Sequence, residues 1–143
     1  GLCYRYFPSK EILFDSAIDQ YAEILAGQFA EQSKNITLPL KEVIEKMPTS
    51  VEDQNTKYYS VFHGPQNRKF HLQLSLKTCE KLVPIVEKLL QKAEEQGEVH
   101  LEDIPTAARF CVFGQLGILM EDGLDQEDKT NRIRAFLLYA LHL

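Results

Sequence analysis

The sequence predicts an all-α protein, a helical bundle of about six helices. Apolar residues recur at helical spacing along almost the whole chain, and residues typical of helix starts and stops separate the segments. No segment alternates with a period of two, so a sheet is not expected. With 143 residues, 44% of them hydrophobic and 26% charged, the chain can form one domain with a hydrophobic core.

The first two helices are predicted from their capping residues. A long helix of about six turns begins at Ser9, whose hydroxyl can accept a hydrogen bond from a free backbone N–H, and fades near residues 33–35. Its apolar stripe consists of Phe14, Ile18, Tyr21, Leu25 and Phe29. A short helix follows from about Leu38 to Met47, with Thr37 as its cap and Pro39 in its first turn.

Prolines and glycines divide the middle of the chain. One segment starts at Thr49-Ser50 and is broken by His63-Gly64-Pro65. The next runs from about Gln66 to a break at Leu82-Val83-Pro84, because proline lacks a backbone N–H. A further helix is expected from Pro84 to a stop at Gly97.

The last two helices predict a homodimer. Asp103-Ile104-Pro105 opens the first, and Asp125 or Asp128 caps the second. Both helices are apolar on more than one face, so each must be buried against its own core and against another surface. The glycines of the first allow a second helix to approach closely, although they could instead ease packing inside the monomer. The predicted interface comprises Gly114, Gly117, Ile118, Phe136, Leu137 and Ala140.

Composition excludes several classes of function. The net charge of −5 gives no basic face for nucleic acid. No apolar run approaches the length of a membrane span and no signal peptide opens the chain, so we expect a soluble, cytoplasmic protein without a membrane partner.

The three cysteines, Cys3, Cys79 and Cys111, form no CxxC pair and are expected to be buried and reduced.

The opening residues carry a more specific pattern. A Tyr-x-Tyr-Phe-x-Ser-Lys-Glu string leads into the first amphipathic helix. It resembles the junction that follows the recognition helix in TetR-family transcriptional regulators. The matching positions are Gly1, Tyr4, Tyr6, Phe7, Ser9, Lys10, Glu11 and Leu13. The rest of the chain is similar to the family's ligand domain in the order of its helices.

The resemblance implies a division of the chain and a set of DNA contacts. Residues 1–8 correspond to the remnant of the DNA-binding head, and residues 9–143 to the effector-binding and dimerisation domain. The family's preceding helices, which enter the major groove, are absent from this sequence, which begins at Gly1 without a Met and is expected to be a fragment or processed product. Tyr4 and Lys10, and more weakly Arg5, would contact operator phosphates. Alternatively, Tyr4 packs against the absent helices and Lys10 is solvated.

Catalytic and metal-binding patterns are absent from the sequence. No HExxH, GxSxG or P-loop motif is present, and no cofactor is expected. His63 and His71 would stand about 12 Å apart on one helix, too far to share a metal. The sequence therefore does not predict an enzyme.

A small-molecule pocket is the stronger expectation. Two clusters rich in aromatic residues predict an effector cavity. The expected effector is an apolar or aromatic small molecule. The predicted lining is Tyr58, Tyr59, Phe62, His63, Phe70, His71, Leu74, Phe110 and Phe113. Polar groups to orient the ligand would come from His63, His71, Gln73, Gln115 and Tyr59. The alternative for each aromatic is an ordinary core residue.

These expectations combine into one function and one rival. The sequence predicts an effector-responsive homodimeric regulator, a repressor in the family's usual case, whose ligand shifts the DNA-binding heads. The rival is a helical small-molecule-binding or protein-interaction module that does not bind DNA. The acidic charge and the absent DNA-reading helices support the rival.

Overall fold

The structure is all-helical, as the sequence predicted. We describe residues 10–47 and 68–143 of the computed structural model, in which no strand is present. The five helices of these ranges are α2 (Lys10–Lys34), α3 (Leu40–Lys46), α5 (Arg68–Glu95), α6 (Ile104–Leu119) and α7 (Gln126–Ala140). The segment predicted to start at Thr49-Ser50 lies outside the described residues. No described helix is long and apolar enough to span a membrane.

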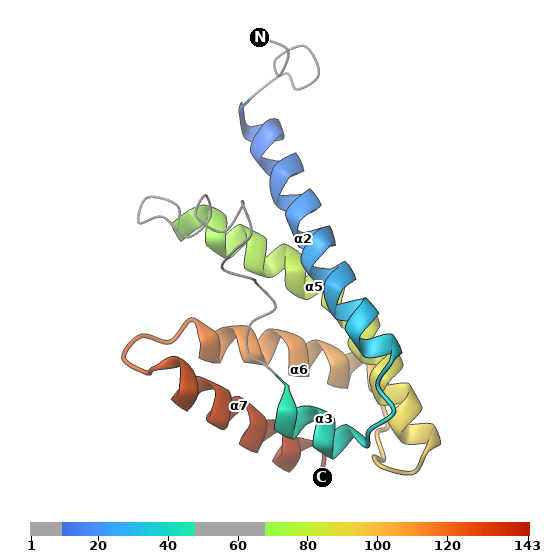
Figure 1. Ribbon diagram of the computed structural model, residues 1–143. Helices are drawn as coiled ribbons and strands as arrows, with labels where there is room; N and C mark the ends of the chain where they lie inside the picture. Colours follow the sequence, from blue (N-terminus) through green and yellow to red (C-terminus); the bar gives the residue numbers. More distant parts are fainter. Residues whose placement is uncertain (1–9, 48–67) are drawn as a thin grey trace.

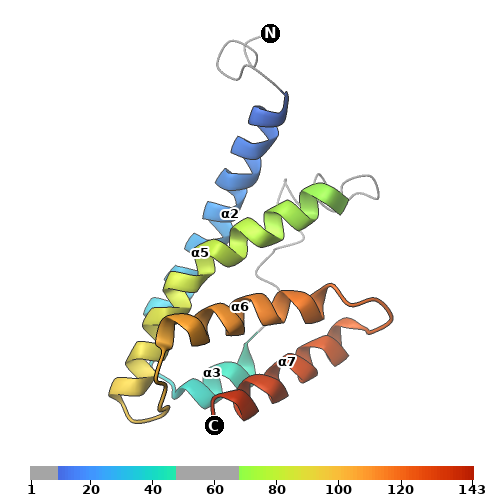
Figure 2. The same cartoon turned by 180° about the vertical axis from the view of Figure 1, so that it is seen from behind.

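The described helices pack against one another in pairs. α2 packs on α5, α5 on α6, and α6 on α7, while α3 packs on α7. The N-terminal end of α2 lies farthest from α6 and α7 (Figure 1). Seen from behind, α6 and α7 lie side by side below α5, with α3 next to α7 (Figure 2).

The predicted break at Pro84 is wrong, because α5 continues through it from Arg68 to Glu95. The proline ring is exposed, and so is Glu80, the residue whose carbonyl loses its helical partner. That carbonyl lies in the water-facing part of the helix and can be solvated. Val83, which precedes the proline, and Leu90, which follows it, are both buried. Packing of both halves therefore keeps the helix continuous.

The segment that follows α5 is hydrogen-bonded to the start of α3. Gly97 adopts a φ of +74°, as expected for a helix stop, and the N–H groups at positions 97 and 98 donate to the carbonyls at positions 94 and 93. Thr37 does not cap α3, because Pro39 precedes its first residue without a side-chain cap bond. Instead, the Leu40 N–H donates to Oε2 of Glu98 at 2.6 Å.

The caps of α6 and α7 follow the prediction. Asp103 accepts a hydrogen bond from the N–H of Thr106 at 3.0 Å. Asp125, rather than Asp128, caps α7 and accepts from the N–H of Asp128 at 2.8 Å. The Thr106 hydroxyl and N–H both stabilise the ionised Asp103 carboxylate and lower its pKa.

The buried residues form two separate clusters. The first, the α2–α5 cluster, consists of Ile18, Tyr21, Ala22, Leu25 and Leu74, with Phe70 packed against it. The second, the main core, joins α3, the part of α5 from Cys79 onward, α6 and α7. Its buried members are Leu40, Ile44, Cys79, Val83, Leu90, Ala93, Val99, Ala108, Val112, Ile133, Leu137 and Leu141.

Candidate functional site

A cavity of about 190 Å³ lies between the C-terminal part of α2 and the main core. Residues from every described helix line it. They are Gln28, Phe29, Gln32, Ile36, Leu40, Val43, Ile44, Met47, Val86, Leu89, Leu90, Cys111, Gln115, Leu137 and Leu141. An apolar cavity of about 150 Å³ is sufficient to bind benzene. This cavity can therefore hold a small organic molecule.

The part of the cavity wall formed by the described residues is apolar and carries three side-chain amides. Apart from Gln28, Gln32 and Gln115, its lining side chains are aliphatic, aromatic or sulfur-containing, and none of these described residues is charged. Gln28 and Gln32 are exposed, one turn apart on α2, whereas Gln115 is half-buried on α6. The arrangement matches the general pattern of ligand pockets, in which a few polar groups orient a mostly apolar molecule.

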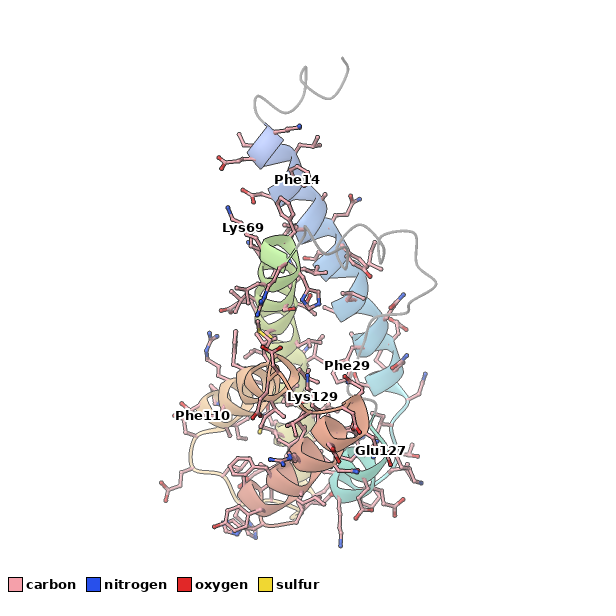
Figure 3. The ribbon with its side chains drawn as sticks, turned by 90° about the vertical axis from the view of Figure 1, so that its left-hand side faces the viewer. Phe14, Phe29, Lys69, Phe110, Glu127 and Lys129 are labelled. Carbon is pink, nitrogen blue, oxygen red and sulfur yellow. The ribbon has the colours of Figure 1, made fainter. Side chains whose placement is uncertain are left out.

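α2 brings its part of the wall into place through its pairing with α5. Leu25 is buried in the α2–α5 cluster, and Phe29 follows one turn later on the cavity wall. Figure 3 shows Phe29 on the side of α2 that faces α6 and α7. The same helix thus contributes both to a tightly packed cluster and to the cavity.

Charged side chains outside the cavity hold the backbone of its wall. Nζ of Lys92 donates to the carbonyl of Ile36 at 3.1 Å, and Glu98 accepts from the Leu40 N–H. Charge-assisted hydrogen bonds are stronger than neutral ones, so both contacts fix the connection between α2 and α3.

Arg134 of α7 fixes the other end of α3. Its Nη2 donates to the carbonyl of Met47, a cavity-lining residue, at 2.6 Å. Its Nε is buried and has no hydrogen-bond partner among the described residues. The Arg134 side chain is not part of the cavity wall.

The two described cysteines are free thiols and not nucleophiles. Cys111 lies on the cavity wall, and burial raises the pKa of its thiol. Burial, reinforced by the neighbouring Glu80 carboxylate, raises the pKa of Cys79 to about 11. Both thiols therefore remain protonated near neutral pH and act as small apolar groups. Cys3 lies outside the described residues.

The predicted effector residues on α5 do not line the cavity. Phe70 stacks on Phe14 of α2, with ring centroids 4.6 Å apart. Leu74 is 2% exposed and belongs to the α2–α5 cluster, and His71 is half-buried nearby on the same helix. Because α5 continues past Pro84, its N-terminal half extends along α2, away from the cavity.

The predicted effector aromatics on α6 also lie outside the cavity. Phe110 is 77% exposed and points away from the helices (Figure 3). Phe113 is partly buried beneath Arg109, whose guanidinium lies 5.1 Å from its ring centroid. Four further predicted residues, Tyr58, Tyr59, Phe62 and His63, lie outside the described residues.

Gln115 is the polar candidate that the structure places on the wall. Gln73, also considered as a polar group, is half-buried on α5 and does not line the cavity. The sequence-based prediction missed Gln28, Gln32 and the aliphatic wall. Aliphatic residues at helical spacing look the same whether they face a packed core or a void, so only the glutamines offered a signal.

Most of the predicted dimer residues lie on the outer side of α6 and α7. Gly114 and Gly117 are exposed, and a Cβ placed on either would meet no atom of the described residues within 4 Å. Packing against the described residues of the subunit therefore does not account for these glycines. We name this surface the α6–α7 face. It comprises Phe110, Gly114, Gly117, Phe136, Tyr139 and Ala140.

Two of the predicted interface residues face inward instead. Leu137 is 7% exposed, belongs to the main core and lines the cavity. Ile118 is half-buried and packs against the main core. Leu137 follows Phe136 directly, so the two side chains lie about 100° apart around the helix and cannot share a face.

The predicted DNA-contacting residues are described only in part. Lys10 is exposed at the first position of α2, while Tyr4 and Arg5 lie outside the described residues. Within ranges 10–47 and 68–143, no group of His, Cys, Asp and Glu side chains could hold a metal ion. The cavity is therefore the candidate site considered for the described part of the chain.

No protein-family model matches this chain, and no curated protein or solved structure matches it either. Three features of the described residues bear on its function: the cavity, helix α2 that leads to it, and the α6–α7 face.

Proposed function

We propose that this chain is the effector-binding and dimerisation part of a TetR-like transcriptional regulator that acts as a homodimeric repressor. The observation that carries the proposal is the position of the cavity against α2. Residues Gln28, Phe29 and Gln32 of this helix form part of the wall. The other end of the same helix begins at Lys10, within the TetR-like sequence pattern.

α2 is long enough to convert a small change at the cavity into a large one at its start. Lys10 and Phe29 are separated by about 28 Å along the helix at 1.5 Å per residue, so a tilt of about 10° would move Lys10 by about 5 Å. The heads of a dimer engage half-sites about 34 Å apart, and a shift of this size prevents simultaneous binding. An effector causes the shift only if it binds the tilted state more tightly.

The α6–α7 face supports the homodimer. Phe136 and Tyr139 are 64% and 76% exposed, and Phe110 on the neighbouring helix is exposed to a similar degree. Beside them, Gly114 and Gly117 leave room for the backbone of a second helix. Two such faces related by a two-fold axis would form a four-helix interface in which one patch buries itself.

Analytical ultracentrifugation tests the dimer. We expect the chain to sediment as a dimer and Phe136→Glu to sediment as a monomer, because the charge would be buried at the interface. Ile24→Glu is the matched control, since Ile24 is 42% exposed on α2, and it should remain dimeric. A monomeric chain, or a dimer that Phe136→Glu leaves intact, would remove α6 and α7 from the interface.

The coding sequence upstream of Gly1 tests the DNA-binding function. A helix-turn-helix pattern of about forty residues encoded there would support the regulator. A start codon close upstream of Gly1 would overturn it in favour of a small-molecule-binding or interaction module without a DNA-reading head.

A further inference from the structure

We infer that the cavity takes an uncharged, mainly apolar molecule that carries one hydrogen-bonding group, and that Gln115 orients this group. The inference rests on the proposed effector function for the role of the site. The chemistry of the ligand follows from the wall itself.

The described residues of the wall offer no counter-charge. None of the described residues that line the cavity is Asp, Glu, Lys, Arg or His. Three charged side chains outside the wall bind its backbone: Lys92 donates to the Ile36 carbonyl, Glu98 accepts from the Leu40 N–H, and Arg134 donates to the Met47 carbonyl. The Nε of Arg134 has no partner among the described residues and is the one charged group that an anion could reach. An ion moved from water into such a site would be desolvated without a partner, which strongly disfavours binding. A neutral ligand does not have this penalty.

Gln115 requires a polar group on the ligand. Its side-chain amide carries two N–H donors and a carbonyl acceptor. Unlike the exposed Gln28 and Gln32, Gln115 is half-buried, so a purely apolar ligand would separate its amide from water without replacing the lost hydrogen bonds. An amide, hydroxyl or carbonyl on the ligand would replace them. The exposed glutamines can keep their contact with water at the α2 side.

A matched series of eight-carbon compounds tests the charge preference. Octanamide, octanoate and octylammonium each contain eight carbons in an unbranched chain and differ in the head group. Titration calorimetry of the 143-residue chain at neutral pH should give octanamide an affinity at least about tenfold higher than either ion, because only the ions lose hydration without a counter-charge.

Three outcomes of this titration would overturn the inference. Octanoate binding as tightly as octanamide would show that an anion reaches the buried Nε of Arg134, which has no partner among the described residues. Octylammonium binding as tightly as octanamide, or no binding by any of the three, would equally overturn it.

Substitution of the glutamine tests the orienting role. Gln115→Leu keeps the volume and removes the amide, and should weaken octanamide about three- to tenfold, the range for one hydrogen bond. Gln73→Leu, a half-buried glutamine of α5 outside the wall, should leave the affinity unchanged. Cys111→Leu, which fills part of the cavity, should reduce binding of octanamide and so locate the site. Circular dichroism of each variant verifies the fold.

The outcomes separate this inference from the proposed function. A monomeric chain that binds octanamide through Gln115 would overturn the dimeric regulator and support the ligand chemistry. If the chain is a dimer and Gln115→Leu leaves the affinity for octanamide unchanged, the result would support the dimeric assembly of the regulator and overturn the orienting role of Gln115.

Discussion

The two halves of α5 support two different kinds of packing. Its N-terminal half joins α2 in the α2–α5 cluster, where Tyr21, Ala22 and Leu25 are at most 2% exposed. Its C-terminal half contributes to the main core, but Val86 and Leu89 border the cavity. One continuous helix therefore runs from a closed contact to an incompletely filled one.

This difference in packing assigns different mechanical roles to the α2–α5 pair and to the region around the cavity. Close-packed helices transmit displacement because their side chains leave no room to adjust independently. The α2–α5 pair should move as one body, and the region around the cavity has the free volume that a ligand can occupy. Substitutions that remove or add the same side-chain volume in the two regions can test this contrast.

Removal of a leucine side chain should have the largest effect. Leu25→Ala in the α2–α5 cluster should lower the free energy of unfolding by about 3–5 kcal/mol, because it creates a new void in a closed contact. Leu89→Ala should cost less than about 2 kcal/mol, because one side of Leu89 already faces the cavity. Urea unfolding followed by circular dichroism measures both. Equal losses would show that the two regions are packed alike.

Addition of volume should show the same asymmetry as its removal, with the larger loss of stability in the α2–α5 cluster. Ala22 is 0% exposed between α2 and α5, so Ala22→Leu should destabilise the protein by about 1–3 kcal/mol through overpacking. Cys111→Leu adds volume at the cavity wall and should change stability by less than about 1 kcal/mol in either direction. The same unfolding measurement applies. A larger loss for Cys111→Leu than for Ala22→Leu would contradict the presence of free volume at Cys111.

The features that the sequence predicted correctly are local ones. Gly97, Asp103 and Asp125 end or begin helices through bonds to residues no more than five positions away, so their effect can be anticipated without a fold. Pro84 is the counterexample. Its local preference is to break a helix, and packing of Val83 and Leu90 on distant elements overrides that preference.

The site was harder to anticipate than the fold. Aromatic clustering indicated a pocket at Phe70 and Phe110, but one ring stacks on Phe14 and the other is exposed. The cavity depends instead on how closely α2 approaches α6 and α7. This distance is set by tertiary packing, and no sequence pattern predicts it. Gln115 was found because a polar residue in a strongly apolar helix is conspicuous on chemical grounds.

The smallest expected effect concerns an ion-pair cluster beside the α2–α5 cluster. Nζ of Lys81 lies 2.7 Å from Glu23 Oε1 and 3.2 Å from Asp19 Oδ1. The hydrogen bond with Glu23, assisted by Asp19, raises the pKa of Lys81. The stabilisation is therefore complete below the unfolded-state pKa of about 10.4 and is lost as the pH rises through the higher folded-state pKa.

Lys81→Met should lower the free energy of unfolding by less than about 1 kcal/mol at neutral pH, because both carboxylates are largely exposed. The difference from the unsubstituted chain should shrink in high salt and disappear above the folded-state pKa of Lys81. Lys88→Met, at an exposed lysine of the same helix, should show neither dependence. Urea unfolding at low and high salt, and from pH 7 upward, measures these changes. A loss that salt and alkaline pH leave unchanged would assign the contribution of Lys81 to the packing of its alkyl chain against α2 rather than to its charge.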